Sequence, residues 1–156
     1  MAREEVDHAL ADLGERMGMP GLRLDGAGAC QLLFDQRWLV TLLDVPSHAG
    51  IALNCPVTTA AEGSRLGGEA MRAMLQASFH GLGGVGTTLA MGPDERPYLQ
   101  RLVPVTGSAA ADVQRAIELL LDQAETWSAR LARPEPASHG NTPAVQSATD
   151  WAMQRV

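Results

Sequence analysis

The chain opens with a helical pattern of hydrophobic positions. Val6, Leu10, Leu13 and Met17 recur at steps of four and three, which places them on one side of a helix. Acidic residues occupy the first turn, where the helix dipole favours negative charge, and a glycine and a proline follow the last apolar position. The pattern predicts a helix over residues 3–18.

An alternation of apolar and polar residues replaces this period after residue 21. Leu22 and Leu24 flank Arg23, and alternation resumes over 30–34, beyond a turn sequence rich in Asp and Gly at 25–28. Side chains that alternate between two faces are typical of β-strands. We therefore expect strand structure on both sides of this turn.

Two further stretches continue the strand pattern. Residues 37–45 are apolar at odd and even positions alike, which predicts a central strand whose two faces are both covered. Residues 51–55 alternate again, and Pro56 makes a continued central strand unfavourable because proline lacks an N–H group. These strands are expected to form an antiparallel meander.

The second half of the chain predicts two helices around a hairpin. Ser64 can cap a helix over 65–80 with an apolar side, and 87–91 and 98–103 are strands on either side of a polar turn. The last helix spans 109–132, with apolar residues at alternating steps of four and three. Its apolar positions are Val113, Ile117, Leu120, Ala124, Trp127 and Leu131.

This element order predicts an α+β fold, helix–three antiparallel strands–helix–two strands–helix (α-β-β-β-α-β-β-α). Strands and helices are segregated along the chain rather than alternating as in parallel sheets. We expect one domain over 1–133. Residues 134–156, rich in Pro, Ser and Ala, are expected to form a mobile C-terminal tail because they have little apolar surface to bury.

Composition excludes several classes of function. The chain of 156 residues has a net charge of −6 and no lysine, which argues against nucleic-acid binding. No apolar stretch is long enough for membrane insertion, and the acidic start lacks the features of a secretory signal. The sequence therefore favours a cytoplasmic protein without nucleic-acid partners.

The candidates for cofactor and metal chemistry are weak. Residues 81–86 fit the pattern G-x-G-x-x-G, but a predicted helix precedes them and a strand follows, the reverse of a dinucleotide site. Cys30, Cys55 and four dispersed histidines show no metal-ligand spacing. We expect no cofactor and no metal site.

Catalytic candidates are also few. Cys30 shares a predicted strand face with Leu32 and Phe34, where a thiol behaves as a small apolar group rather than as a nucleophile. Three carboxylates share one side of the last helix, opposite its apolar stripe, which is usually a solvated face. They are Glu118, Asp122 and Glu125. No catalytic residue is assigned, and the protein is not expected to be an enzyme.

An excess of apolar positions is the clearest feature of the sequence. The predicted helix over 65–80 carries Met71, Met74, Leu75 and Phe79, and the strand over 37–45 is apolar on both faces. Either these residues all pack into one core, or some of them contact another chain.

Several motifs resemble one family in order and spacing. Leu13-Gly14, the stretch Met17 to Pro20 and the stretch Leu24 to Asp35 resemble the opening of the Tir-chaperone (CesT-like, class I) family of type III secretion chaperones. Residues 86–99 resemble its fourth and fifth strands, and Ala124 to Leu131 resembles the end of its last helix. The resemblance covers residues 3–133, and residues 134–156 extend beyond many members.

The resemblance implies an acidic bacterial homodimer in the cytoplasm. It would bind an extended segment near the N-terminus of one or more secreted effector proteins and keep that segment competent for secretion. The dimer contact would come from the second helix and fourth strand, namely Met71, Met74, Leu75, Leu89 and Met91. Contact with the effector is expected from the first helix and first strands, namely Leu10, Leu13, Leu33, Trp38 and Leu39.

Two alternatives remain open from the residues alone. One is a small ligand-binding or enzymatic α+β domain that uses Cys30 or the acidic side of the last helix. The other is a regulatory adaptor that binds a folded partner, such as the secretion ATPase, through the apolar surfaces or the tail.

Overall fold

The computed structural model describes residues 2–57, 67–79, 86–106 and 109–132. The predicted tail at 134–156, the helix cap at Ser64 and most of the glycine-rich segment at 81–86 lie outside these residues.

The first helix, α1 (Ala2–Arg16), follows its predicted pattern. Val6, Leu10 and Leu13 are completely or almost completely buried on one side of it. Gly14 lies on the same side, where a Cβ atom would lie only 2.5 Å from the carbonyl oxygen of Met19. The glycine lets the following segment fold back tightly against the helix.

Strands β1 (Ala29–Phe34), β2 (Trp38–Val45) and β3 (Gly50–Pro56) form the predicted antiparallel meander. A short 3-10 helix, η1 (Pro46–His48), connects the last two. The strand expected at Leu22 and Leu24 is absent. These leucines instead pack toward the core, and the backbone turns sharply after them, with the amide of Asp25 donating to the carbonyl of Ala29 at 2.7 Å.

The remaining elements are α2 (Gly68–Phe79), β4 (Thr87–Met91), β5 (Pro97–Pro104) and α3 (Ala109–Leu131). All strand pairs are antiparallel, and the sheet order is β1-β2-β3-β5-β4. The two edges of the sheet are therefore β1 and β4.

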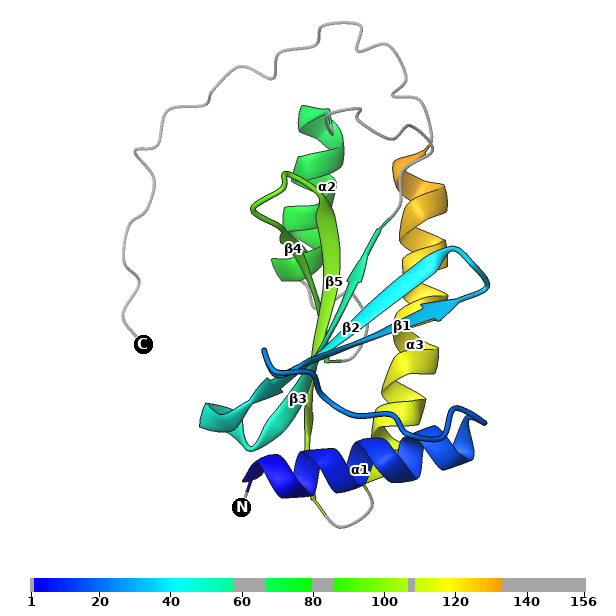
Figure 1. Ribbon diagram of the computed structural model, residues 1–156. Helices are drawn as coiled ribbons and strands as arrows, with labels where there is room; N and C mark the ends of the chain where they lie inside the picture. Colours follow the sequence, from blue (N-terminus) through cyan, green and yellow to red (C-terminus); the bar gives the residue numbers. More distant parts are fainter. Residues whose placement is uncertain (1, 58–66, 80–85, 107–108, 133–156) are drawn as a thin grey trace, which may run out of the picture.

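The core lies between one face of the sheet and the three helices (Figure 1). Helix α3 packs on β3 and β5, α1 crosses near its N-terminal end, and α2 packs on β4. The core side of the sheet is lined by register partners such as Leu42 with Leu53 and Cys55 with Leu99. The α+β prediction and its element order are thus confirmed.

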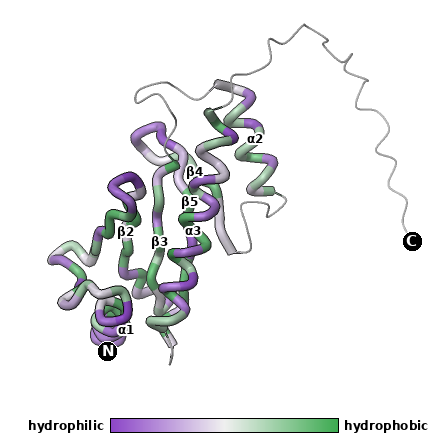
Figure 2. Tube along the Cα trace, turned by 90° about the vertical axis from the view of Figure 1, so that its right-hand side faces the viewer, coloured by the Kyte–Doolittle hydropathy of each residue, from purple (hydrophilic) through white to green (hydrophobic). Residues whose placement is uncertain are grey.

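The other face of the sheet is not covered by the described helices. Leu39 is exposed and Leu43 is half-buried there, while their neighbours Trp38, Val40 and Leu42 are buried toward the helices. Within the described part of the chain, the second face of this strand is therefore uncovered, contrary to the expectation that both faces are covered. We call this surface the open face. In the tube view turned by 90°, hydrophobic positions predominate along β2 and β3 (Figure 2).

No helix within the described ranges has the length and apolar character that crossing a lipid bilayer requires.

Candidate functional site

The most exposed apolar pair of the sheet lies on the β1–β2 hairpin. Leu33 and Leu39 are register partners, so their side chains stand next to each other on the open face. Leu33 is 62% exposed and Leu39 is 36% exposed. We call these two residues the hairpin pair. Two neighbouring leucines on a surface form a small apolar patch that a partner side chain can cover.

The tip of the hairpin is tightly folded beside this pair. Asp35 and Gln36 both adopt positive φ angles, 50° and 53°, and the amide of Arg37 donates to the carbonyl of Phe34 at 2.9 Å. The guanidinium of Arg37 stacks over the Trp38 ring at 4.5 Å. The turn therefore holds the hairpin pair at the edge of the sheet.

The other residues expected to contact an effector lie in the core. Leu10 and Leu13 are completely buried on the inner side of α1, and Trp38 is buried on the face of the sheet that the helices cover. They have almost no surface to offer another chain in this conformation. Only Leu33 and Leu39 of the five combine an apolar side chain with exposure.

The open face carries a pattern that was missed from the sequence. A polar row crosses all five strands through successive register partners: Gln31, Thr41, Asn54, Gln100 and Thr88. An apolar row of alanines and leucines lies two residues along the strands, about 7 Å away. It consists of Ala29, Leu43, Ala52 and Leu102. The hairpin pair lies on the opposite side of the polar row, so apolar contacts flank a row of hydrogen-bonding groups.

An Asp-centred turn fixes the start of the edge strand β1. One carboxylate oxygen of Asp25 accepts from the amides of Ala27, at 2.8 Å, and Ala29, at 3.0 Å. The Arg3 guanidinium of α1 donates to the carbonyl of Asp25 at 2.9 Å. The amides of Ala29 and then Ala27 lower the pKa of the Asp25 carboxyl because they stabilise its charged form. The outer edge of β1 faces no other strand of the sheet.

The second exposed apolar surface is on α2. Met71, Leu75 and Phe79 recur every four residues, and Leu75 and Phe79 are 68% and 86% exposed. Together with Met91 at the end of β4, which is also exposed, we call them the α2 surface.

Two residues expected at a dimer contact lie beneath this surface. Met74 and Leu89 are buried in the core between α2 and β4. The Ser78 hydroxyl also joins the two elements, since it donates to the carbonyl of Leu89 at 3.0 Å. They hold α2 on the edge strand rather than presenting surface themselves.

The catalytic candidates do not form a site. Burial raises the pKa of the Cys55 thiol to about 12 and also raises that of Cys30, so both thiols are poor nucleophiles at neutral pH. Glu118, Asp122 and Glu125 are all exposed on α3. Among the described residues, no three His, Cys, Asp or Glu side chains come together as metal ligands.

Comparison with known structures places the fold. A chain of the ExsC–ExsE complex superimposes with a TM-score of 0.72 at 24% identity, over 83% of this chain and 95% of that chain. A chain of the HopA1–SchA chaperone–effector complex gives 0.70 at 16% identity, over 83% and 97%. A chain of the Yersinia pestis type III secretion chaperone SycH in complex with a YscM2 fragment gives 0.60 at 14% identity, over 78% and 98%. No protein with a curated description matches the sequence.

A match to a sequence profile identifies the family more firmly than these structural similarities do, because the profile spans most of the folded part of the chain. It extends over residues 8–128, from the first helix to the last turns of α3, and it includes every strand described above. The predicted resemblance is thereby confirmed. The chain belongs to the Tir chaperone protein (CesT) family.

Proposed function

We propose that this protein is a type III secretion chaperone that binds an extended N-terminal segment of one or more secreted effector proteins. Its family supports this function, and the hairpin pair is the observation that carries it. Leu33 and Leu39 are exposed leucines at the edge of a sheet whose open face has no cover among the described helices. Such a surface favours a polypeptide partner over a small ligand, which needs a concave pocket.

The effector segment would contact two kinds of group. Its apolar side chains would pack on Leu33 and Leu39, and its main chain could pair with the outer edge of β1. The side-chain amides and hydroxyls of the polar row would donate hydrogen bonds to the parts of the segment that cross the sheet and accept hydrogen bonds from them. A segment held this way cannot fold locally, which keeps it extended.

The test is capture of partners by the tagged full chain from its own bacterium, followed by binding of purified N-terminal effector segments. The double variant Leu33→Asp/Leu39→Asp should lose binding by at least about tenfold, because charges replace the apolar contact. The matched control is Leu119→Asp, since Leu119 is 41% exposed on α3, away from the hairpin.

Two results would contradict the proposal. One is the absence of any secreted protein among the captured partners. The other is equal binding of an effector segment by the wild type and the double variant, both shown to be folded by circular dichroism. Retained binding by the Leu119→Asp control, with loss in the double variant, would support it.

We also propose a homodimer that uses the α2 surface. A two-fold axis through Leu75 would set Met71 of each chain against Phe79 of the other, because the three residues are spaced symmetrically along α2. Helix α2 and strand β4 would then gain cover for apolar groups that a single chain leaves exposed.

The protein would act by binding rather than by catalysis, in the bacterial cytoplasm. The family supports both statements, and the raised pKa values of Cys30 and Cys55 offer no activated nucleophile. Contact with the secretion ATPase stays a prediction of the sequence.

A further inference from the structure

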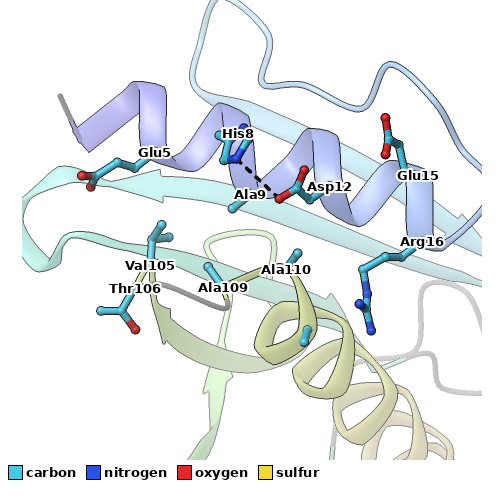
Figure 3. A pocket seen from close by; sticks show the side chains of 11 residues that line it. Glu5, His8, Ala9, Asp12, Glu15, Arg16, Val105, Thr106, Ala109 and Ala110 are labelled. Carbon is cyan, nitrogen blue, oxygen red and sulfur yellow. Dashed lines mark ion pairs between the residues drawn. The ribbon is translucent and has the colours of Figure 1, made fainter.

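A groove runs between α1 and the start of α3 (Figure 3), and its lining includes no residue of the hairpin pair or of the α2 surface. It has a volume of about 760 Å³ and is lined by α1, by the two residues that follow β5 and by the first turn of α3. We call it the α1–α3 groove.

The floor of this groove is made of small apolar side chains. Ala9 of α1, Val105, and Ala109 and Ala110 of α3 supply it, and Thr106 adds one hydroxyl. Small side chains leave room for another chain to approach the backbone closely. Three carboxylates line the α1 side: Glu5, Asp12 and Glu15.

A side-chain hydrogen bond connects α1 to α3 at one end of the groove. The Arg16 side chain points toward α3, where its Nε donates to the Gln114 side-chain oxygen at 3.1 Å. Gln114 in turn donates to a Glu118 carboxylate oxygen at 3.1 Å. The single guanidinium of the lining is therefore engaged at this end. Asp12 lies 3.6 Å from the Nε2 atom of His8, and both side chains are exposed.

We infer that the α1–α3 groove binds a basic segment of a different protein, with arginine or lysine side chains against Glu5 and Asp12 and small apolar side chains on the alanine floor. The apolar floor supplies contact area and the carboxylate rim supplies charge complementarity, which steers a cationic segment and sets its register. This site is separate from the effector contact proposed above and does not depend on it.

The acidic lining of the groove argues against a second copy of the chain, or its own C-terminal residues, as the bound segment. A second copy has a net charge of −6 and no lysine, so it offers no basic segment that would match the carboxylates of the groove. Residues 133–156 carry Arg133 and Arg155 but also Glu135 and Asp150, so they supply no excess of positive charge. A separate basic protein fits the rim better than either.

The probe is a short fluorescein-labelled peptide of alternating arginine and alanine pairs, and its control replaces each arginine by citrulline, which has the same shape without the charge. Fluorescence anisotropy with the full chain at about 50 mM salt measures both affinities. The variant Glu5→Gln/Asp12→Asn should weaken binding of the arginine peptide about tenfold. The matched control Asp122→Asn/Glu125→Gln removes the same charge from the exposed side of α3.

A third variant, Ala110→Phe, fills the floor without changing the charge and should also weaken binding. An equal loss in the Asp122→Asn/Glu125→Gln control would overturn the inference, because attraction to net charge would then explain it. Equal affinity for the citrulline peptide would overturn it as well. Unchanged binding by Ala110→Phe would place the peptide outside the groove and would also contradict the inference.

Discussion

Gly14 lies at a point of α1 where the chain leaves no room for a side chain. A Cβ atom there would lie 2.5 Å from the Met19 carbonyl oxygen and 2.9 Å from the Leu22 Cβ atom. Two of its near neighbours are thus a backbone atom and the first carbon of a side chain, neither of which can rotate away. The backbone after α1 must therefore move to admit even a methyl group.

We expect Gly14→Ala to lower the free energy of unfolding by about 1–3 kcal/mol, because overpacking outweighs the gain in helix propensity. Urea unfolding followed by circular dichroism measures the change. Gly26→Ala is the control, since a Cβ atom at Gly26 meets nothing within 4 Å. A stabilised Gly14→Ala protein would show that the segment after α1 can shift without cost.

Cys55 makes stability depend on pH in the alkaline range. Its thiol has a pKa of about 12 in the folded chain because burial disfavours the thiolate, whereas the value in an unfolded chain is 9.0. Above pH 9 the unfolded chain loses this proton first, so the folded state binds more protons and stability falls as pH rises toward 12.

We expect Cys55 to account for a loss of about 2 kcal/mol in the free energy of unfolding between pH 9 and pH 11. The measurement is urea unfolding at both pH values for the wild type and for Cys55→Ala. The variant is less stable at every pH, but the pH-dependent part should be smaller than in the wild type. Equal pH dependence in the two proteins would contradict the assignment.

At the scale of elements, α2 shows how one helix serves two purposes. Its inner side, with Met74 and Ala77, packs on β4, and its outer side presents Met71, Leu75 and Phe79. A helix that is apolar on both sides is usually covered on both sides. The outer side is the reason to expect a second chain there.

Leu75→Glu should convert the proposed dimer to a monomer, because the two-fold axis brings the introduced charge into the contact twice. Light scattering after gel filtration would then give the mass of one chain, 16.5 kDa, instead of twice that value. Leu119→Glu on α3 is the control and should leave the mass unchanged. A folded Leu75→Glu protein with the dimer mass would exclude α2 from the interface.

At the scale of the whole molecule, the buried hydrophobic residues of the described ranges form one core that runs from Val6 to Trp127. It joins α1, α2, α3 and the five strands into one cluster. The prediction that residues 1–133 form a single domain can therefore be tested by measuring the stability of a chain that ends there.

We expect a chain ending at residue 133 to unfold with a Tm within about 2 °C of that of the full chain, because the transition depends on the core. Differential scanning calorimetry of the two chains measures this. A chain shortened further, to residue 123, is the control and should be strongly destabilised because it lacks Ala124 and Trp127 of the core. A large loss of Tm on removing only 134–156 would show that the tail packs on the domain.

Much of the fold could be predicted because it depends on local repeats. The steps of four and three over 113–131 can bury one stripe only as a helix, and α3 spans Ala109–Leu131. The hairpin between β4 and β5 likewise follows from a polar turn between two alternating stretches. The alternation of Leu22 and Leu24 was misleading because two alternating residues also suit a segment that packs beside a helix.

The candidate site was predictable only in part, for a physical reason. Sequence periodicity identifies an apolar side of an element, but not whether another element covers that side. Leu10, Leu13 and Leu33 are all leucines in regular patterns, yet the first two are buried and the third is exposed. The polar row needs the register of five strands, which pairs residues as distant as Gln31 and Thr88 only through three intermediate strands.

The sequence by itself determined the order of helices and strands, the turns between them and the family, because these depend on spacing between near neighbours along the chain. Only the tertiary structure decided which apolar residues remain exposed, namely the hairpin pair and the α2 surface, and that α1 and α3 enclose an acidic groove. Burial is a property of the packed whole: a side chain is removed from water by residues distant in sequence, and no local pattern records which face they cover.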